Sequence, residues 1–251
     1  MTIDLRPIEI DSEIFGLDVW DLVGAKSIDD FTEAIAILGN SKRQSYVSCK
    51  IPIKQISDIH AAERAGFEFV ETQFRTVLGL RESHDTDKYP YDYIRVETEA
   101  ELIAVQSIAE STIEHDRFSL DPMIGKNLSG TRYKKYLEQS FQRSDDEIWC
   151  VKSRSSGEIL TFRSHRILSD KEVQLLIGGV HSNYKDVGLG VISSHYCFSH
   201  LKAAGYSRAV THISAANLPI VNLEIGHFNF RVADTSVVLR AVVTPLLLTD
   251  K

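Results

Sequence analysis

The sequence predicts a mixed α/β (α+β) protein, in which helices flank a mixed central sheet. Runs rich in branched apolar residues alternate with segments of helical apolar spacing along nearly the whole chain. A chain of 251 residues with 43% hydrophobic and 25% charged residues has the composition of an ordinary globular protein with a large core. A polar segment at 82–90, closed by Pro90, divides this succession, so we expect domains at 1–90 and 91–251.

Before the dividing segment, the spacing predicts two helices and two strands. The first helix has Ser27 or Asp29 as its N-cap and stops at Gly39. The second ends at Gly66, where a long strand begins. The expected ranges are helix 29–38, strand 46–51, helix 56–65 and strand 67–80.

After residue 90 the pattern restarts with a strand and a helix. The polar segment 115–122 is predicted to be irregular, and the turn at 155–158 predicts a hairpin. The expected ranges are strand 93–96, helix 100–113, helix 131–141, strands 148–152, 159–162 and 173–180, helix 191–204, strand 209–213, a short helix near 219–223, and final strands within 228–243.

The two parts of the chain share a sequence pattern. Phe67 and Phe69 precede Val77-Leu78 at the same offsets at which Phe228 and Phe230 precede Val238-Leu239. Residues 45–51 likewise resemble 207–213. Either the sequence similarity between these two units is a coincidence, or the chain contains a duplicated half-domain. In the second case only the C-terminal copy carries paired glycines.

The segment 173–204 has the features of an anion site. A predicted strand ends in Gly178-Gly179, and a turn with Gly188 and Gly190 leads into a helix. The N–H groups of a first helical turn have no partner within the helix, and the helix dipole adds positive potential there. Lys185 adds a full charge, so we expect this turn to bind a phosphate group.

Three known phosphate loops were compared with this turn. A dinucleotide fingerprint requires a third glycine where Ser193 stands, and the Gly-Lys-Ser/Thr of a Walker loop is absent. Lys185-x-x-Gly188-x-Gly190 resembles the acyl-CoA pyrophosphate loop of the GCN5-related N-acetyltransferases (GNATs), with Lys for the usual Gln or Arg. A plain structural turn is the alternative.

The resemblance extends beyond the loop. Residues 93–240 resemble a GNAT domain in the order of their elements, and Phe15-Gly16, the stretch 65–71, and Asp116-Arg-Phe118 with Asp121 resemble the TDP-fucosamine acetyltransferase group. This resemblance implies a GNAT fold with splayed strands, preceded by a truncated GNAT-like half-domain. It also implies transfer of an acetyl or 3-hydroxybutanoyl-like group from acyl-CoA to the amine of a dTDP-linked amino-dideoxy sugar, for synthesis of surface polysaccharide such as lipopolysaccharide O-antigen.

By position, the resemblance also implies site residues. The Val180 amide would face the thioester oxygen, and Asn217 would bond the pantetheine or acyl group. The family's usual tyrosine acid is missing, because Leu223, Glu224 and Ile225 stand there. Glu224, His181 and His227 are the candidate proton carriers, although each residue type is more often structural. The expected coenzyme-binding residues are Ile177, Gly178, Gly179, Val180, Lys185, Val187, Gly188, Leu189, Gly190, Val191 and Asn217.

For the sugar nucleotide, Arg117 and the basic cluster at 132–135 are expected to pair with the diphosphate. Phe118, Tyr133 or Tyr136 would stack on thymine, with Asp121 nearby. In the alternative interpretation, 131–141 is an ordinary surface helix whose basic residues point outward.

Charge and composition limit the partners. A net charge of −7 argues against nucleic-acid binding, and no apolar run reaches the roughly 20 residues of a membrane span. Three distant cysteines and the absence of a signal-peptide pattern indicate a reduced, cytoplasmic protein, and no metal is expected. The sequence does not specify the oligomeric state, and a monomer or homodimer is expected. A GNAT acting on a peptide or small free amine, or a non-catalytic CoA-binding regulator, remains open.

Overall fold

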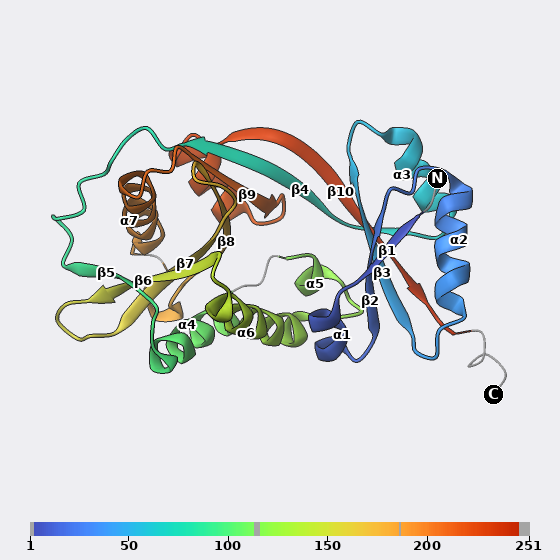
Figure 1. Cartoon of the computed structure of the whole chain (residues 1–251), viewed down its shortest axis with the longest axis horizontal. Helices are drawn as coiled ribbons and strands as arrows, with labels where there is room; N and C mark the ends of the chain where they lie inside the picture. Colours follow the sequence, from blue (N-terminus) through green and yellow to red (C-terminus); the bar gives the residue numbers. More distant parts are fainter. Residues whose placement is uncertain (1–2, 113–115, 186, 246–251) are drawn as a thin grey trace.

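The computed structural model describes residues 3–112, 116–185 and 187–245, and within them ten strands form one mixed sheet (Figure 1). Along the sheet the strands follow the order β1-β2-β3-β10-β4-β9-β8-β7-β6-β5. Their bounds are β1 Asp4–Pro7, β2 Asp18–Val23, β3 Ser45–Pro52, β4 Glu68–Gly79, β5 Tyr91–Arg95, β6 Asp146–Ser153, β7 Ile159–Ile167, β8 Glu172–Val180, β9 Arg208–Ser214 and β10 Arg231–Val243.

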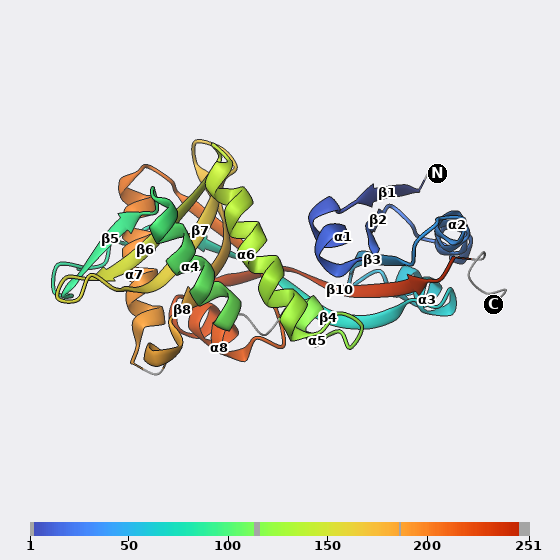
Figure 2. The same ribbon diagram turned by 90° about the horizontal axis from the view of Figure 1, so that it is seen from below.

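Helices cover both faces of the sheet, as the sequence predicts. In the C-terminal half α4 and α6 pack on one face and α7 on the other, while α2 and α3 cover the N-terminal half opposite α1 and α5 (Figures 1 and 2). Their bounds are α1 Glu9–Phe15, α2 Ile28–Gly39, α3 Ile56–Arg64, α4 Glu99–Thr112, α5 Arg117–Leu120, α6 Lys126–Gln142, α7 Leu189–Ala203 and α8 Leu218–Val221, with a 3-10 helix at Ser182–Tyr184 and a π-helix at Asn222–His227.

The two halves of the chain exchange their long strands. β4 leaves the N-terminal half to pair with β9, and β10 returns from the C-terminal half to pair with β3. The two long strands also pair with each other, and Phe74 lies opposite Thr235 near their middle. This reciprocal arrangement is what a duplicated strand–helix–long strand unit would produce. The division at residue 90 stays a prediction, and hydrogen bonding in the sheet continues across both halves.

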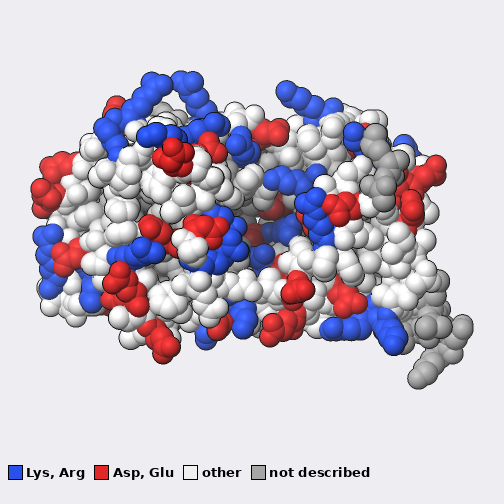
Figure 3. Space-filling view, in the orientation of Figure 1, with Lys and Arg blue, Asp and Glu red and all other residues white. Residues whose placement is uncertain are grey.

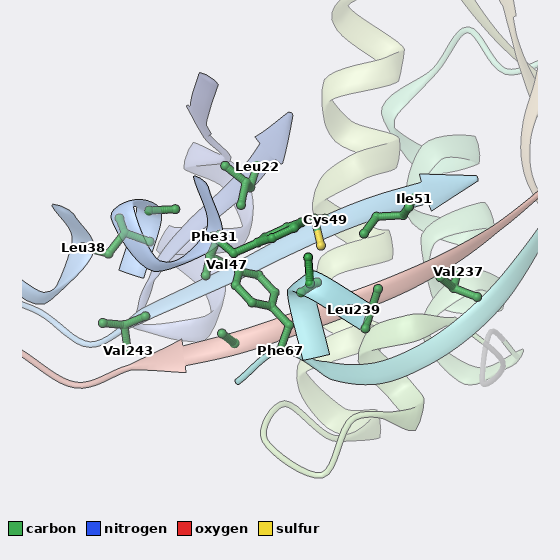
Figure 4. Packing of buried hydrophobic residues seen from close by; sticks show 14 residues of the cluster. Leu22, Phe31, Leu38, Val47, Cys49, Ile51, Phe67, Val237, Leu239 and Val243 are labelled. Atoms are coloured by element: carbon green, nitrogen blue, oxygen red, sulfur yellow. The ribbon is translucent and has the colours of Figure 1, made fainter. Parts of the chain in front are cut away.

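The exchanged strand β10 belongs to the core of the N-terminal half, and the residue just before it belongs to the core of the C-terminal half. Its Leu239 packs with Phe31, Val47 and Phe67 in the N-terminal half, where the two phenylalanine rings meet edge to face at 5.3 Å (Figure 4). At the other end of the connection, Phe230 belongs to the cluster under α7. Between the halves the surface is hollowed, and Lys and Arg side chains are visible around the hollow (Figure 3).

Residues 4–23, for which no helix or strand is expected, form β1, α1 and β2, and three further segments also differ from the sequence-based expectations. Residues 231–243 form one long strand rather than several, because β4 pairs with residues 231–240 and β3 with residues 236–243, so that partners are present along its whole length. The helix expected over 131–141 begins at Lys126, since buried Ser129 bonds Asp116. The segment 115–122, expected to be irregular, contains α5, whose N-cap Asp116 accepts from the Ser119 amide at 2.6 Å; His115 lies outside the described residues.

Other local predictions are confirmed. Ser27 caps α2 in a capping box with Asp30, and the three cysteines are buried and unpaired. Of the helices in the described ranges, none is long and apolar enough to cross a membrane.

Candidate active site

β8 and β9 are parallel but pair over only three positions, from Glu172–Arg208 to Gln174–Val210. Beyond Gln174 they separate, while β8 stays paired with β7 as far as Val180. The prediction of splayed strands is therefore confirmed. The backbone edge of β8 toward β9, from residue 175 to 180, borders the opening and can hydrogen-bond an extended ligand.

The N-terminus of α7 lies at this opening. Gly188 occupies the N-cap position with φ = 78°, a left-handed conformation that favours glycine, and no side chain among the residues that the structure describes caps the helix. A methyl group at Gly190 would lie 3.8 Å from Leu223 Cδ2 and 4.0 Å from Val180 Cγ2. The start of α7, the end of β8 and the π-helix therefore meet at one place.

This helix start suits a phosphate group. By helix geometry its first amides have no partner in the preceding turn, and they carry the positive end of the dipole. Val191 and Ile192 both donate to the Gly188 carbonyl, so the free donors belong to the residues before them. Val187 is 64% exposed and Lys185 is also exposed, which leaves the approach to these amides open to solvent.

The paired glycines of β8 have a structural reason of their own. A Cβ at Gly178 would lie 3.1 Å from the Phe162 carbonyl oxygen, and a Cβ at Gly179 would lie 2.9 Å from both Phe162 Cε1 and Thr112 Oγ1. Side chains at these positions would push β8 away from β7 and α4. Close packing of the chain alone therefore accounts for both glycines, whether or not a ligand also approaches them.

Glu224 is the titratable group buried beside the opening. It is 5% exposed, and its Oε2 accepts a hydrogen bond of 3.3 Å from the Thr76 hydroxyl of β4. Burial raises the pKa of Glu224 to about 7, although the positive charge of Arg163 acts to lower it. Arg163 in turn donates to the Ser194 hydroxyl of α7 at 2.5 Å. A carboxyl group with this pKa can hold or release a proton near neutral pH.

The other two candidate proton carriers, His181 and His227, are more exposed than Glu224. His181 follows β8, and its Nδ1 accepts from the Asn183 amide at 3.2 Å. The His181 ring borders a pocket of ≈ 400 Å³ against α4, together with Lys152 and Glu158. His227 is exposed and lies edge-on to Phe228. No recorded contact within the described residues joins either histidine to Glu224.

Two further predicted residues have partners within the chain. Asn217 caps α8, because its Oδ1 accepts from the Ile220 amide at 3.3 Å, which leaves its amide nitrogen as the available donor. Tyr184 donates to Glu158 Oε2 at 2.9 Å, in agreement with the packing role expected for such a tyrosine.

The residues assigned to the sugar nucleotide lie mostly in the interior. Phe118 is 1% exposed and packs 5.0 Å from the Phe15 ring, so a base cannot stack on it in this structure. Asp121 is buried and accepts from the Tyr46 hydroxyl at 3.0 Å and from Arg240 at 2.9 Å. These two side chains join α5 to the N-terminal half, which corrects the expectation that they face a ligand.

The tyrosines of α6 differ in their accessibility. Tyr133 is buried, and its hydroxyl donates to Asp116 at 2.5 Å, so its ring is also unavailable to a base. Tyr136 is half-buried. Arg117 keeps an accessible part, with its guanidinium 4.6 Å from the centre of the Phe118 ring. Arg132 of the basic cluster is paired with buried Asp11 at 2.6 Å.

The sequence reasoning missed Arg163, Thr76 and Ser194. No local motif marks them, because each lies on a regular element and meets Glu224 or α7 only through the tertiary fold. Within the described ranges no group of three or more His, Cys, Asp or Glu side chains could hold a metal ion.

Comparisons of the sequence with family models and with curated proteins find no match. Comparison of the structure does find similar folds. A GCN5-related N-acetyltransferase from Sphaerobacter thermophilus superposes with a TM-score of 0.67 at 11% identity, over 97% of this chain and 76% of that one. A tandem GNAT protein from the clavulanic acid biosynthesis pathway gives 0.63 at 11% identity, over 90% and 76%.

A third solved structure, a GCN5-related N-acetyltransferase from Kribbella flavida, has a TM-score of 0.56 at 12% identity, over 89% of this chain and 80% of that one. At these identities the likeness establishes the fold and nothing finer. The chain therefore has a GNAT-like fold over nearly its whole described length, including the N-terminal half.

Proposed function

We propose that this protein is an acyl-CoA-dependent N-acyltransferase. The observation that carries the proposal is the uncapped N-terminus of α7, which lies where β8 and β9 separate and where Val180, Gly190 and Leu223 meet. The coenzyme's diphosphate would bind the amides from Val187 to Gly190, with Lys185 adding its charge, because the Val191 amide already donates to the Gly188 carbonyl. The pantetheine arm would lie along the open edge of β8, at Ile177 to Val180, as an added strand does.

The chain's own groups then supply the chemistry. The Val180 amide would donate to the thioester oxygen as negative charge develops there, and a single donor of this kind contributes about 3–4 kcal/mol. Deprotonating a sugar amine with a pKa near 8 costs only ~1–1.5 kcal/mol at neutral pH. Positioning and oxyanion stabilisation therefore account for more of the rate than a strong base would.

Glu224 is the proposed acid in place of the missing tyrosine. Its carboxyl group is buried and accepts a hydrogen bond from Thr76. The preceding residue, Leu223, lies beside Gly190 at the start of α7. With a pKa of about 7 it is partly protonated at neutral pH, so it can give a proton to the departing thiolate. His181 would act as a proton carrier only for acceptors that bind beside α4.

The proposed acceptor is the amine of a dTDP-linked amino-dideoxy sugar, and the proposed donor is acetyl-CoA or a 3-hydroxybutanoyl-like CoA. A peptide or small free amine is the second candidate, which the burial of Phe118, Asp121 and Tyr133 favours because it removes three expected nucleotide contacts. A non-catalytic CoA-binding regulator would bind coenzyme without turning it over.

Thiol release with purified protein separates these functions. Acetyl-CoA and 3-hydroxybutanoyl-CoA are each incubated with dTDP-amino sugars, peptides and small amines, and CoA binding is measured separately by calorimetry. We expect binding of both coenzymes and thiol release with an amine of one class. Binding without thiol release from any amine would favour the regulator, and absence of CoA binding would contradict the proposal.

A further inference from the structure

A second cluster of polar side chains lies on the sheet face opposite α7. It comprises Lys50 of β3, Glu71 and Gln73 of β4, and His212 and Ser214 of β9, and we call it the central cluster. It lies where the strands of the two halves join, and the α5 helix with Arg117 covers the same face. Figure 3 shows the hollow between the halves with basic side chains around it.

The register places these side chains together. Lys50 lies opposite Val238 on β10, and Val238 lies opposite Glu71 on β4. One step along β4, on the same face, Gln73 lies opposite Ser214. Residues directly opposite one another in a sheet point to the same face, so Lys50, Glu71, Gln73 and Ser214 share one surface. The Lys50 ammonium donates to the Gln73 side chain at 2.5 Å.

Glu71 is the unusual member of the central cluster. It is 4% exposed, and its Oε2 has no hydrogen-bond partner among the residues that the structure describes. Its Oε1 accepts a long bond of 3.4 Å from Gln73, and the Ser214 hydroxyl is close enough to lower the pKa of Glu71. Leaving a buried polar atom without a partner costs roughly 1–3 kcal/mol, so a sequence that keeps such a group has a use for it.

The charges around Glu71 have a definite pattern. Burial and the negative charge of Asp116 raise the pKa of Glu71, while Ser214, Arg117 and Lys50 lower it. Burial together with Lys50 and Arg75 lowers the pKa of His212 to about 4, so this ring is neutral at pH 7. One buried carboxyl group therefore has two cations, Lys50 and Arg117, close enough to influence it. A ligand with an amine and an anionic group would complement this arrangement.

The central cluster lies near the level at which β9 ends in the sheet. Gln73 is level with Ser214, the last residue of β9, so Glu71 lies just beyond the point where β9 ends. β8 is in register with β9 as far as Gln174, beyond which the strands separate, and Val180 is the last residue of β8. An amine held by Glu71 would therefore approach the end of β8 from the face opposite α7.

We propose that Glu71 receives the acceptor amine, and that Lys50 and Arg117 bind an anionic group, a carboxylate or a phosphate, on the same acceptor. This inference rests on the proposed N-acyltransferase function and specifies its substrate as an amine that carries an anion. It also assigns an essential contact to the N-terminal half, which supplies both Lys50 and Glu71.

The acceptor ammonium gives one proton to the Glu71 carboxylate, and the neutral nitrogen attacks the thioester carbonyl carbon. The N–C bond forms, the C–S bond breaks, and the nitrogen loses its second proton to solvent. The sulfur leaves as thiolate and takes a proton, which gives an amide and the free thiol of CoA.

Two variants with matched controls test the inference. Lys50→Met is compared with Lys54→Met, and Glu71→Gln with Glu63→Gln, because both control residues are exposed. The acceptors are a dTDP-amino sugar and an α,ω-amino acid, each beside a neutral amine of the same length, and the readouts are KM, kcat and acceptor binding by thermal shift. The two anionic acceptors distinguish phosphate from carboxylate recognition.

We expect Lys50→Met to raise KM at least about 10-fold for an anionic acceptor and to leave the neutral amine unchanged, since a charge-assisted hydrogen bond is lost. Glu71→Gln should lower kcat about 10²-fold or more without changing CoA binding. Equal effects on neutral and anionic acceptors, unchanged kinetics in Glu71→Gln, or wild-type protein that binds no anionic amine would overturn the inference. If the protein fails to bind CoA, the proposed function itself fails, which calorimetry with CoA alone reveals.

Discussion

The Thr76 hydroxyl of β4 donates a hydrogen bond of 3.3 Å to Glu224 on the π-helix, and so a strand from the N-terminal half holds a buried carboxyl group of the C-terminal half. Because β4 also pairs with β9, this strand forms one side of the region that contains the proposed active site. The N-terminal half therefore contributes directly to the proposed active site.

Replacing Glu224 by Gln should lower kcat by about 10²–10³-fold while leaving CoA affinity unchanged, because the amide cannot protonate the leaving thiolate. In the wild type, kcat should fall above pH 7 as Glu224 loses its proton. Steady-state kinetics from pH 5.5 to 9 measure both effects, with exposed Glu33→Gln as the control. Retention of full kcat in Glu224→Gln would exclude this residue as the acid.

The same substitution should change how stability depends on pH. The folded-state pKa of Glu224, about 7, lies above its ordinary value of 4.5, so the folded protein holds this proton more tightly than the unfolded chain. Its contribution is present below pH 4.5 and is lost as pH rises through 7, by up to about 3 kcal/mol. Urea unfolding should therefore show Glu224→Gln gaining stability relative to wild type between pH 5 and pH 8. An equal difference at both pH values would contradict the assigned shift.

Gly179→Ala should destabilise the fold by about 1–3 kcal/mol, because its new methyl group would lie 2.9 Å from Phe162 and Thr112. Gly226→Ala is the matched control, since nothing lies within 4 Å of a Cβ there. Thermal unfolding of the two variants makes the comparison. If both changes were neutral, the packing reason given for the paired glycines would be wrong.

Separating the chain at residue 90 should prevent residues 91–251 from folding alone. β9 would lose its partner β4, and β10 would lose both β3 and β4, which leaves long unpaired edges. Circular dichroism and size-exclusion chromatography of the isolated segment are the measurements. A monomeric segment with a cooperative unfolding transition would show that the division marks an independent domain.

Local signals predicted much of this fold. The capping box at Ser27, the spacing of α2, and the glycine turn before α7 depend on residues close in sequence, so the sequence reveals them directly. The splay of β8 and β9 followed only from the family resemblance, since no local pattern specifies where two parallel strands part.

Long-range effects account for the rest. Phe118 and Asp121 resemble ligand-binding residues in a polar segment, but α5 buries them against Tyr46 and Arg240, which are distant in sequence. Glu71 is one charged residue within a long strand, and its burial becomes evident only when β10 pairs beside it. Neither environment can be predicted without the order of the strands.

The central claim is that the N-terminal amides of α7 hold the diphosphate of CoA, and a charge placed among them tests it directly. Gly188→Asp and Gly188→Asn introduce side chains of equal size at the N-cap, where both residue types are favoured and tolerate the left-handed backbone. Isothermal titration with acetyl-CoA should show affinity falling at least about 10-fold further in Gly188→Asp than in Gly188→Asn, because the carboxylate repels the diphosphate and competes for the same amides. Equal affinity in the two variants would contradict the claim.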